Sequence, residues 1–308
     1  RYRFRVPHSE EWADYVWPGL MIKPDKVIAL QDVEFGEDDI VIATYPKAGT
    51  TWASEVVSAI AYEGNVDVIK EIRMDFRVPW MEINDKSWLL NTLFVLKHNV
   101  KLLLPKADHK VKPKKNVYFT HLPLELLPRS ILAGKCKLLY VARNPKDQCV
   151  SLYHFHKMAR FLGQQTDTTW DEFFRIFASE NIMLGGWFEH VLGYWRFVRN
   201  NPRAKFIKFE EMKADLLAEM PDLEEFVGVK LPPEVREKVV RHCSFDSMKD
   251  NKMTNREGVL LFNQSNTKFM RKGIVGDWKN YFTLAQSEAF DQLYKQRMDG
   301  SGLDFVFE

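Results

Sequence analysis

Four short apolar runs predict β-strands along the chain; they cover residues 41–44, 116–120, 137–142 and 205–209. Between these runs, apolar residues recur at the spacing of helices. After the first run, for example, the apolar pair Val56 and Val57 is repeated four residues later by Ile60 and Ala61. Strands that alternate with helices are typical of a mostly parallel sheet wrapped by helices. The pattern therefore predicts an α/β fold.

The first predicted strand leads into a loop that is suited to an anion. Tyr45 and Pro46 end the strand, residues 47–49 (Lys-Ala-Gly) supply a cation and a permissive turn, and Thr50 and Thr51 open a helix. Unpaired backbone N–H groups, two hydroxyls and the positive end of the helix dipole would all face one anion, which we expect to be a 5′-phosphate. Because the lysine precedes the glycine, the segment does not match the ATP- and GTP-binding pattern G-x-x-x-x-G-K-[ST].

The second predicted strand ends at a histidine. His121 follows the strand in VYFTHLP, where Pro123 marks a turn. Ligands of open α/β sheets bind at the carboxyl ends of the strands, and a histidine there can act as a general base near neutral pH.

Two basic motifs follow later strands. Arg143 in VARNPKDQCVS offers a planar fork for phosphate, with Ser151 as an added donor. In FMRKGIVGDWKN, Arg271 and Lys272 stand beside Gly273, which resembles a second phosphate clamp. A helix-terminal anion site with two basic clamps indicates a nucleotide that is phosphorylated at both ends.

The composition narrows the classes of protein to which the chain can belong. The 308 residues are 45% hydrophobic and can bury one large core, so we expect one domain over residues 1–308. With 44 basic and 42 acidic residues, the net charge of +2 does not predict general nucleic-acid or membrane binding. Three widely spaced cysteines without a C-x-x-C pair indicate neither a disulfide framework nor a zinc site. With no apolar run near 18 residues and no secretory signal, the cytoplasm is the expected location.

Two polar segments are expected to form mobile lids. Residues 101–115 are rich in lysine and proline, and residues 251–268 are rich in Asn, Thr and Ser. Apolar residues and an aspartate dilute the lysines of the first segment, which favours a solvated loop over a nucleic-acid patch.

The motifs TYPKAGTTW, THLP, YVARNPKDQCVS and RKGIVGDWKN stand in the order and approximate spacing of the cytosolic sulfotransferase family. The chain resembles that family from about Phe35 to its C-terminus. The resemblance implies a single domain around a five-stranded parallel sheet, with 3′-phosphoadenosine 5′-phosphosulfate (PAPS) as the sulfuryl donor, PAP as its product and no metal. It also implies a homodimer formed through Lys279, Thr283, Leu284 and Glu288.

The resemblance assigns roles residue by residue. It makes His121 the catalytic base, Lys47 the cation that neutralises the leaving oxygen, and Ser151 a restraint on Lys47. The 5′-phosphosulfate would contact Lys47, Gly49, Thr50 and Thr51; the 3′-phosphate would contact Arg143, Ser151, Arg271, Lys272 and Gly273; the adenine would contact Trp52, Phe245 and Met248. Further contacts of the nucleotide would be Phe209, Cys243, Phe269 and Met270. A small phenolic or aromatic acceptor, bound through its hydroxyl or amine, would contact Trp80, Ile83, Phe155 and His121.

Three positions depart from the family pattern. Phe119 replaces a lysine that would face the sulfuryl oxygens, Phe209 replaces a tyrosine, and Cys243 replaces a threonine. The second and third changes each remove a hydroxyl hydrogen bond, worth about 0.5–1.5 kcal/mol. Asp85 could pair with an amine acceptor or be a solvated acidic turn.

Other functions remain open beside sulfuryl transfer. A lyase of this fold would sulfate an alcohol and then eliminate it, and a pseudoenzyme would bind nucleotide without turnover. An ATP-dependent kinase would require magnesium and an acidic Mg²⁺ ligand after a strand, and the sequence shows no such ligand convincingly placed.

Overall fold

The structure is a computed structural model that describes residues 2–5, 12–15, 21–83, 111–162, 167–259 and 261–308. Its main sheet has four parallel strands in the order β4-β3-β5-β6. The strands are β3 (Asp39–Thr44), β4 (Asn116–Thr120), β5 (Lys137–Ala142) and β6 (Ala204–Lys208), and a separate antiparallel pair is formed by β1 (Tyr2–Arg5) and β2 (Trp12–Tyr15). The four strands predicted from the apolar runs are confirmed: β4 and β5 have the predicted bounds, β3 starts two residues earlier, and β6 lies one residue earlier.

The prediction of a fifth strand is wrong for the part of the chain that the structure describes. The position beside β4 holds a single bridge between Trp80 and Phe119. Phe119 donates its N–H to the Pro79 carbonyl at 3.0 Å and accepts from the Met81 N–H at 3.0 Å. Pro79 has no N–H with which to extend the pairing, and the chain turns where Ile83 donates to the Trp80 carbonyl at 3.5 Å.

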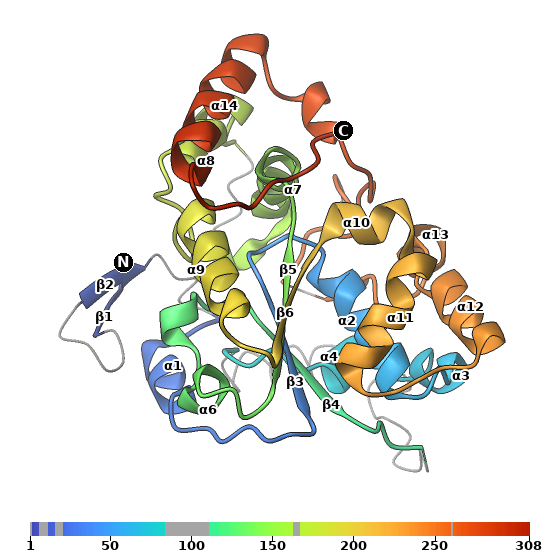
Figure 1. Cartoon of the computed structure of the whole chain (residues 1–308). Coiled ribbons are helices and arrows are strands. Elements are labelled where there is room, and N and C mark those ends of the chain that lie inside the picture. The colour runs from blue at the N-terminus through green and yellow to red at the C-terminus, as the bar shows by residue number, and fades with distance from the viewer. Residues whose placement is uncertain (1, 6–11, 16–20, 84–110, 163–166, 260) are drawn as a thin grey trace.

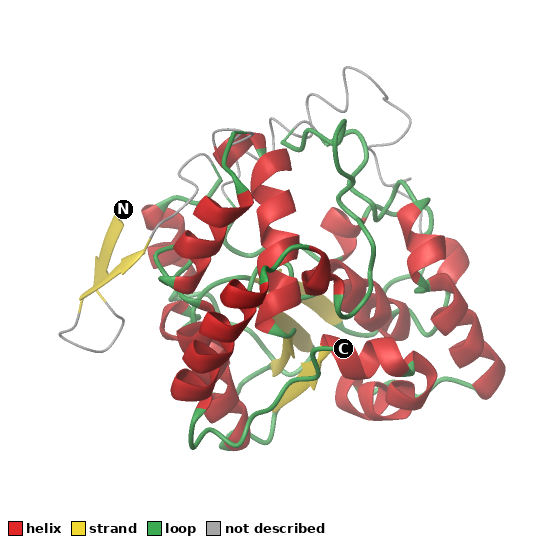
Figure 2. Ribbon diagram, turned by 90° about the horizontal axis from the view of Figure 1, so that it is seen from above, coloured by secondary structure: helices red, strands yellow, loops and turns green. Residues whose placement is uncertain are grey.

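Helices cover both faces of the sheet. Figure 1 shows α9 on one side and α2, α11 and α12 on the other, and Figure 2 shows the same layering from above. The helices are α1 (Pro24–Leu30), α2 (Thr50–Ala61), α3 (Val66–Ile69), α4 (Met74–Arg77), α6 (Arg129–Leu132), α7 (Pro145–Met158), α8 (Trp170–Ala178), α9 (Trp187–Arg199), α10 (Phe209–Ala214), α11 (Leu216–Val227), α12 (Pro233–His242), α13 (Phe245–Lys249) and α14 (Leu284–Met298), with 3₁₀ turns η2 (Leu124–Leu126), η3 (Arg160–Leu162) and η4 (Asp277–Asn280). No helix among the described residues has the length and apolar character needed to cross a membrane.

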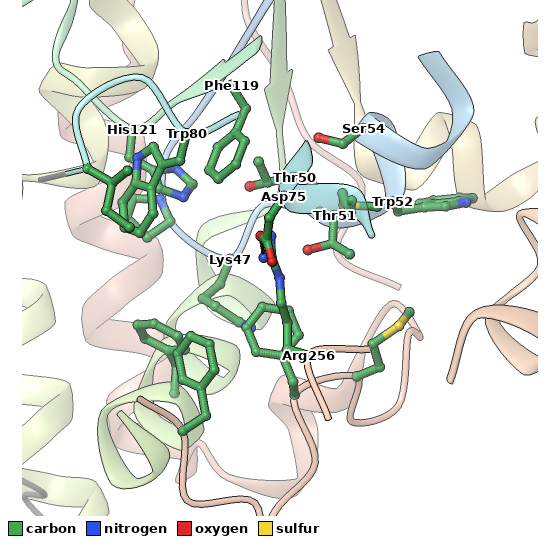
Figure 3. Close-up of a pocket in the computed structure, with 18 of the residues that line it drawn as sticks. Lys47, Thr50, Thr51, Trp52, Ser54, Asp75, Trp80, Phe119, His121 and Arg256 are labelled. Atoms are coloured by element: carbon green, nitrogen blue, oxygen red, sulfur yellow. Dashed lines mark ion pairs between the residues drawn. The ribbon is translucent and has the colours of Figure 1, made fainter. Parts of the chain in front are cut away.

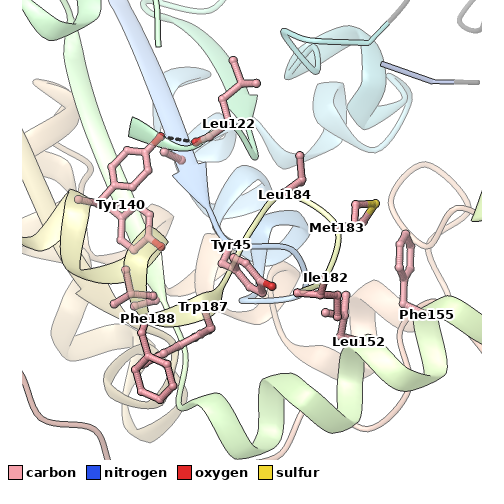
Figure 4. Close-up of a cluster of buried hydrophobic side chains, with 14 of the residues drawn as sticks. Tyr45, Leu122, Tyr140, Leu152, Phe155, Ile182, Met183, Leu184, Trp187 and Phe188 are labelled. Atoms are coloured by element: carbon pink, nitrogen blue, oxygen red, sulfur yellow. Dashed lines mark hydrogen bonds between the residues drawn. The ribbon is translucent and has the colours of Figure 1, made fainter. Parts of the chain in front are cut away.

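The alternation of side chains along β3 divides the core in two. Val41 and Ala43 face the cluster that contains α7, α8, α9 and α14, whereas Ile40 and Ile42 face the cluster that contains α2, α11 and α12. Figure 4 shows the first cluster, in which Tyr45 and other aromatic side chains lie close beneath the end of β3. All five β3 side chains from residue 40 to residue 44 are buried, so the loop that follows starts from a fixed position.

A buried charge network ties four segments together on the second face. The Glu55 carboxylate in α2 accepts from Arg77 Nη2 at 2.8 Å, His242 Nε2 at 2.7 Å and Thr254 Oγ1 at 3.2 Å. Both Glu55 and Arg77 side chains are fully buried. Burial alone would raise the pKa of Glu55, but Arg77 and His242 together hold it below its usual range. The network therefore fixes α4, α12 and the start of the 251–268 segment against α2.

Replacing Glu55 by glutamine should lower the free energy of unfolding by about 3–5 kcal/mol, because it leaves the buried Arg77 charge without its counter-ion. Urea denaturation of both proteins at pH 7 measures the difference. The matched control is Glu37→Gln, since the Glu37 side chain is 85% exposed and pairs with Arg203 only at the surface. An exposed ion pair contributes about 1 kcal/mol or less. If Glu55→Gln lowers the free energy of unfolding by less than that, the network does not have the proposed role.

Candidate functional site

A cavity of about 680 Å³ lies at the carboxyl end of the sheet and is shown in Figure 3. Strand order changes direction between β3 and β5, which is where open α/β sheets bind ligands. The cavity brings together nearly all the side chains that the sequence analysis singled out: Lys47, Gly49, Thr50, Thr51, Trp52, Trp80, Ile83, His121, Arg143, Ser151, Phe155, Phe209, Phe245, Met248, Phe269, Met270, Arg271, Lys272 and Gly273.

The loop after β3 is held in an unusual backbone conformation. Lys47 has φ 72° and Gly49 has φ 108°, so both lie on the left-handed side of conformational space. A Cβ on Gly49 would come within 2.8 Å of the Phe209 ring. Gln148 of α7 supports the loop from below by donating to the carbonyls of Tyr45 at 3.2 Å and Pro46 at 2.8 Å. The predicted phosphate loop is therefore built by contacts from two other segments.

The Lys47 ammonium points into the cavity over two aromatic faces. Its Nζ lies 4.1 Å from the centre of the Phe269 ring and 5.0 Å from that of Phe155. Burial, followed by the nearby Arg143 and Arg271, lowers the pKa of Lys47 to about 7. Ser151 lies on the cavity wall, but none of the hydrogen bonds among the described residues joins it to Lys47. The cation is therefore positioned by the rings.

His121 is fixed in one orientation by the end of β3. Its Nδ1 lies 2.9 Å from the Thr44 carbonyl and 3.1 Å from Thr44 Oγ1, which in turn lies 2.7 Å from Thr50 Oγ1. A proton on Nδ1 donated to that carbonyl leaves the lone pair of Nε2 free. Burial, opposed by the hydrogen bond to Thr44, lowers the pKa of His121 to about 4, and Lys47 adds to the lowering. The imidazole is thus neutral at pH 7.

Two groups beside His121 shape its surroundings. The His121 backbone N–H donates to Glu82 Oε1 at 2.7 Å, and burial raises the pKa of this carboxyl to about 7. Phe119 stacks on Trp80 with ring centres 5.5 Å apart. Each of these two rings makes a T-shaped contact with the His121 ring. Phe119 is buried. The position where the family resemblance implies a lysine therefore belongs to an aromatic cluster.

Arg143 follows β5 and is nearly enclosed. Its Nη2 donates to the Ile274 carbonyl at 2.9 Å, its guanidinium lies 4.5 Å from the centre of the Phe209 ring, and its Nε has no partner among the described residues. Nη2 is 3.8 Å from Asp147 Oδ2. Asp147 also accepts from the backbone N–H groups of Gly276 at 2.8 Å and Trp278 at 3.0 Å. Asp147 thus connects α7 to the second basic motif.

The second basic motif carries its own counter-ion. Arg271 Nη2 and Lys272 Nζ each lie 2.6 Å from one oxygen of Asp277, which is buried. Burial raises the pKa of Asp277, but hydrogen bonds from Lys272, Asn280 and Arg271 outweigh it, so the pKa is lowered. Gly273 has φ 63°, and a Cβ there would come within 2.3 Å of the Phe245 ring.

Cys243 is the predicted contact that does not line the cavity. It is fully buried, and its carbonyl accepts the Trp52 indole N–H at 2.8 Å. The Trp52 ring also meets Phe209 edge-on at 5.2 Å. Cys243 therefore supports the cavity wall through its backbone carbonyl.

Asp85, which could pair with an amine acceptor, lies outside the described residues, as does the 101–110 part of the first expected lid.

The cavity wall contains a charged cluster that was not predicted from the sequence. Arg256 and Arg73 both pair with Asp75, the latter at 2.9 Å, and all three side chains line the cavity. Figure 3 shows Arg256 and Asp75 pointing toward one another near Lys47. Neither periodicity nor a motif indicates this pairing, because Arg256 stands in a polar segment that has no helix or strand.

Known proteins share this fold and these motifs. The family model described as "Sulfotransferase domain" matches residues 37–302. Rat "Sulfotransferase 1C2" is 40% identical over 283 residues, which cover 91% of this chain and 89% of that protein. The crystal structure of mouse sulfotransferase SULT7A1 complexed with PAP is 30% identical, covers 91% of both chains and has a TM-score of 0.67.

A second solved structure supports the fold alone. The crystal structure of retinol dehydratase in complex with androsterone and inactive cofactor PAP has a TM-score of 0.76 at 24% identity, and the match covers 91% of this chain and 86% of that one. With the cavity, the strand order and the family match in agreement, the chain belongs to the sulfotransferase family and is a PAPS-dependent enzyme that transfers sulfuryl groups to small acceptors.

Proposed function

We propose that the cavity binds PAPS across the ends of β3 and β5 and that His121 activates the acceptor hydroxyl. The observation that carries this proposal is the joint placement of the Lys47 loop, His121 and the two basic motifs on one cavity wall. The structures of SULT7A1 and of retinol dehydratase named above were both determined with PAP, the spent form of this donor.

The residues present fit such a nucleotide. Both Gly49 and Gly273 leave backbone open where a Cβ would strike an aromatic ring. The buried Nε of Arg143 lacks a partner, which a phosphate oxygen would supply. The first turn of α2 offers N–H groups that have no carbonyl within the helix. We assign the 5′-phosphosulfate to the Lys47 loop, the 3′-phosphate to Arg143, Arg271 and Lys272 with Ser151, and the adenine to Trp52, Phe245 and Met248. Further contacts of the nucleotide in this proposal are Phe209, Phe269 and Met270.

His121 serves as the general base in this proposal. Its Nε2 lone pair would take the proton of the acceptor hydroxyl as the oxygen attacks sulfur, while its Nδ1–H keeps the ring aligned on the Thr44 carbonyl. PAPS supplies the sulfuryl group when bound. A dianionic or monoanionic group near the ring would raise the pKa of His121 from about 4 toward the range where a base is effective.

Lys47 serves as the cation for the leaving oxygen. The S–O bond to the 5′-phosphate breaks as the acceptor bond forms, and negative charge then develops on the phosphate oxygen that leaves. The Lys47 ammonium, restrained by the Phe155 and Phe269 rings, is the cation that the proposed phosphate loop itself supplies to this oxygen. Ser151 stays a proposed contact of the nucleotide.

The acceptor side of the cavity fits a small aromatic molecule. Trp80, Ile83 and Phe155 line it together with Met21, Ile22 and Phe35. A phenol placed between these apolar walls would present its hydroxyl to His121.

Transfer of label from ³⁵S-PAPS tests the function. The chain is incubated in EDTA with a panel of phenols, amines and alcohols, and products are separated by chromatography. Labelled ester supports sulfotransfer; an alkene with free labelled sulfate supports the lyase; PAP binding without any product supports a pseudoenzyme. A requirement for magnesium and ATP would support a kinase instead.

We also propose a homodimer and a cytoplasmic location. Leu284 is 76% exposed at the start of α14, next to the helix cap Thr283, and a second copy would cover it. Lys279 and Glu288 would flank that contact, with Lys279 pairing to the C-terminal Glu308 in the single chain. All three cysteines are buried and unbridged, which suits a reducing compartment. Of the two expected lids, the described parts, residues 111–115, 251–259 and 261–268, would close over bound ligands; residues 101–110 lie outside the described residues.

His121→Ala should lower kcat by about 10²- to 10⁴-fold, because the acceptor proton loses its base. PAP affinity, measured by calorimetry, should stay within a small factor of the parent. The matched control is His154→Ala, since His154 bonds to Tyr281 at 2.7 Å and does not line the cavity. Full turnover in His121→Ala would refute the assignment, and a parallel loss of PAP binding would make the residue structural.

Gly273→Ala should weaken PAP binding about tenfold or more, since a strained backbone position costs about 1–3 kcal/mol and Phe245 must also move from the wall. Gly258→Ala is the control: its φ of 76° imposes similar backbone strain, but a Cβ there meets nothing within 4 Å. Calorimetric titration with PAP compares the two. Equal losses in both variants would show that strain in the segment, rather than the Gly273–Phe245 contact, controls the affinity.

Leu284→Asp should convert the dimer to a monomer at micromolar concentration, because a carboxylate would be buried at the centre of the contact. Sedimentation velocity measures the state. Ile28→Asp provides the comparison, as Ile28 is 60% exposed but lies on α1. A parent chain that sediments only as a monomer would remove the proposed dimer.

A further inference from the structure

The Arg73–Asp75–Arg256 cluster lies in the wall of the cavity without a place in the proposed chemistry. Arg73 and Asp75 come from the turn before α4 and from its first residues, and Arg256 comes from the 251–268 segment. Their side chains are 11%, 27% and 15% exposed, respectively. All three line the same cavity as Trp80 and His121.

The cluster has more positive than negative charge. One carboxylate serves two guanidinium groups: Asp75 Oδ2 accepts from Arg73 Nη2 at 2.9 Å, and Asp75 Oδ1 pairs with Arg256 Nη1. Each guanidinium has five N–H donors, and the described residues offer these two groups no other acceptor. Burial, together with Arg73, lowers the pKa of Arg256 to about 10, as expected for a cation that lacks full compensation.

Holding the segment in place does not require the cluster. The Met74 backbone N–H already donates to the Met253 carbonyl at 3.0 Å, and Thr254 bonds to Glu55 at 3.2 Å. Both contacts fasten the start of the 251–268 segment beside α4. Within the described part of the chain, two partly buried arginines that face the cavity therefore have donors left for a ligand.

The charge of the cluster selects among acceptors. An ammonium on the acceptor would meet two guanidinium groups and a carboxylate that is already paired twice. A carboxylate would meet N–H donors of two arginines that have no acceptor among the described residues, an arrangement suited to planar anions. The surrounding wall is apolar, with Met74, Phe76 and Trp80 lining it near the cluster.

We propose that Arg73 and Arg256 form an anion-binding subsite in the acceptor part of the cavity, so that preferred acceptors combine a hydroxyl on an apolar or aromatic body with a carboxylate. Asp75 holds the two guanidinium groups together and keeps them turned toward the cavity. The inference rests on the proposed sulfotransfer function, in which His121 receives the proton of the same acceptor.

The test uses phenols that differ only in the group at the end of the two-carbon side chain: 3-(4-hydroxyphenyl)propionate, its primary amide and tyramine. With PAPS saturating, kcat/KM should be about 10- to 100-fold higher for the carboxylate than for the amide, as a charged hydrogen bond provides. Tyramine should be the poorest of the three. In Arg256→Gln and Arg73→Gln, the ratio of carboxylate to amide should fall about tenfold. Lys252→Gln, an exposed change in the same segment, should keep the parent ratio.

A binding measurement tests the anion-binding subsite independently of the proposed sulfotransfer activity. Calorimetry with the PAP-loaded chain compares 3-phenylpropionate, which cannot be sulfated, with its amide; the carboxylate should bind more tightly, and Arg256→Gln should remove the difference. If no acceptor is sulfated, the sulfotransfer proposal fails while this preference still reports the subsite. A parent ratio near one, or equal losses for carboxylate and amide in Arg256→Gln, would overturn the subsite and make the cluster a structural link.

Discussion

The buried carboxylate of Asp147 connects the two halves of the proposed nucleotide site. It accepts backbone N–H groups from Gly276 and Trp278 and the Asn144 side-chain amide, and Arg143 lies 3.8 Å away. An ionised carboxylate inside a protein is stable only with such donors. The 271–278 segment, in turn, has no strand or long helix of its own. The hydrogen bonds from its backbone N–H groups to this carboxylate therefore hold its basic residues in position.

Burial, and after it repulsion between neighbouring cations, lowers the pKa of Lys47 and of Arg143. Lys47, Arg143 and Arg271 face one cavity, and each lowers the pKa of a neighbour. Asp277 neutralises part of this charge by pairing with Arg271 and Lys272. A multiply charged nucleotide therefore enters a site that is positive but already organised, and the protein does not have to gather flexible lysines around it.

Features set by short stretches of sequence were predictable. The four strands, the loop after β3 and the position of His121 follow from local apolar runs and from the rule that parallel strands end at one edge. Contacts between distant segments were not predictable. The Arg256–Asp75 pair joins an irregular segment to α4, and Lys47 lies over aromatic rings rather than on Ser151. The expected fifth strand is reduced to one bridge because Pro79 interrupts the donors at the sheet edge.

The low pKa of Lys47 has a consequence for how the nucleotide binds. With a pKa of about 7, this amine is only partly protonated near neutral pH in the free chain. An anion placed on the loop favours the charged form and raises that pKa. If the donor binds at Lys47 as proposed, its binding is coupled to proton uptake from the solvent. The heat of binding would then include the ionisation heat of the buffer, and the affinity contributed by this residue would decline as the solution becomes more alkaline.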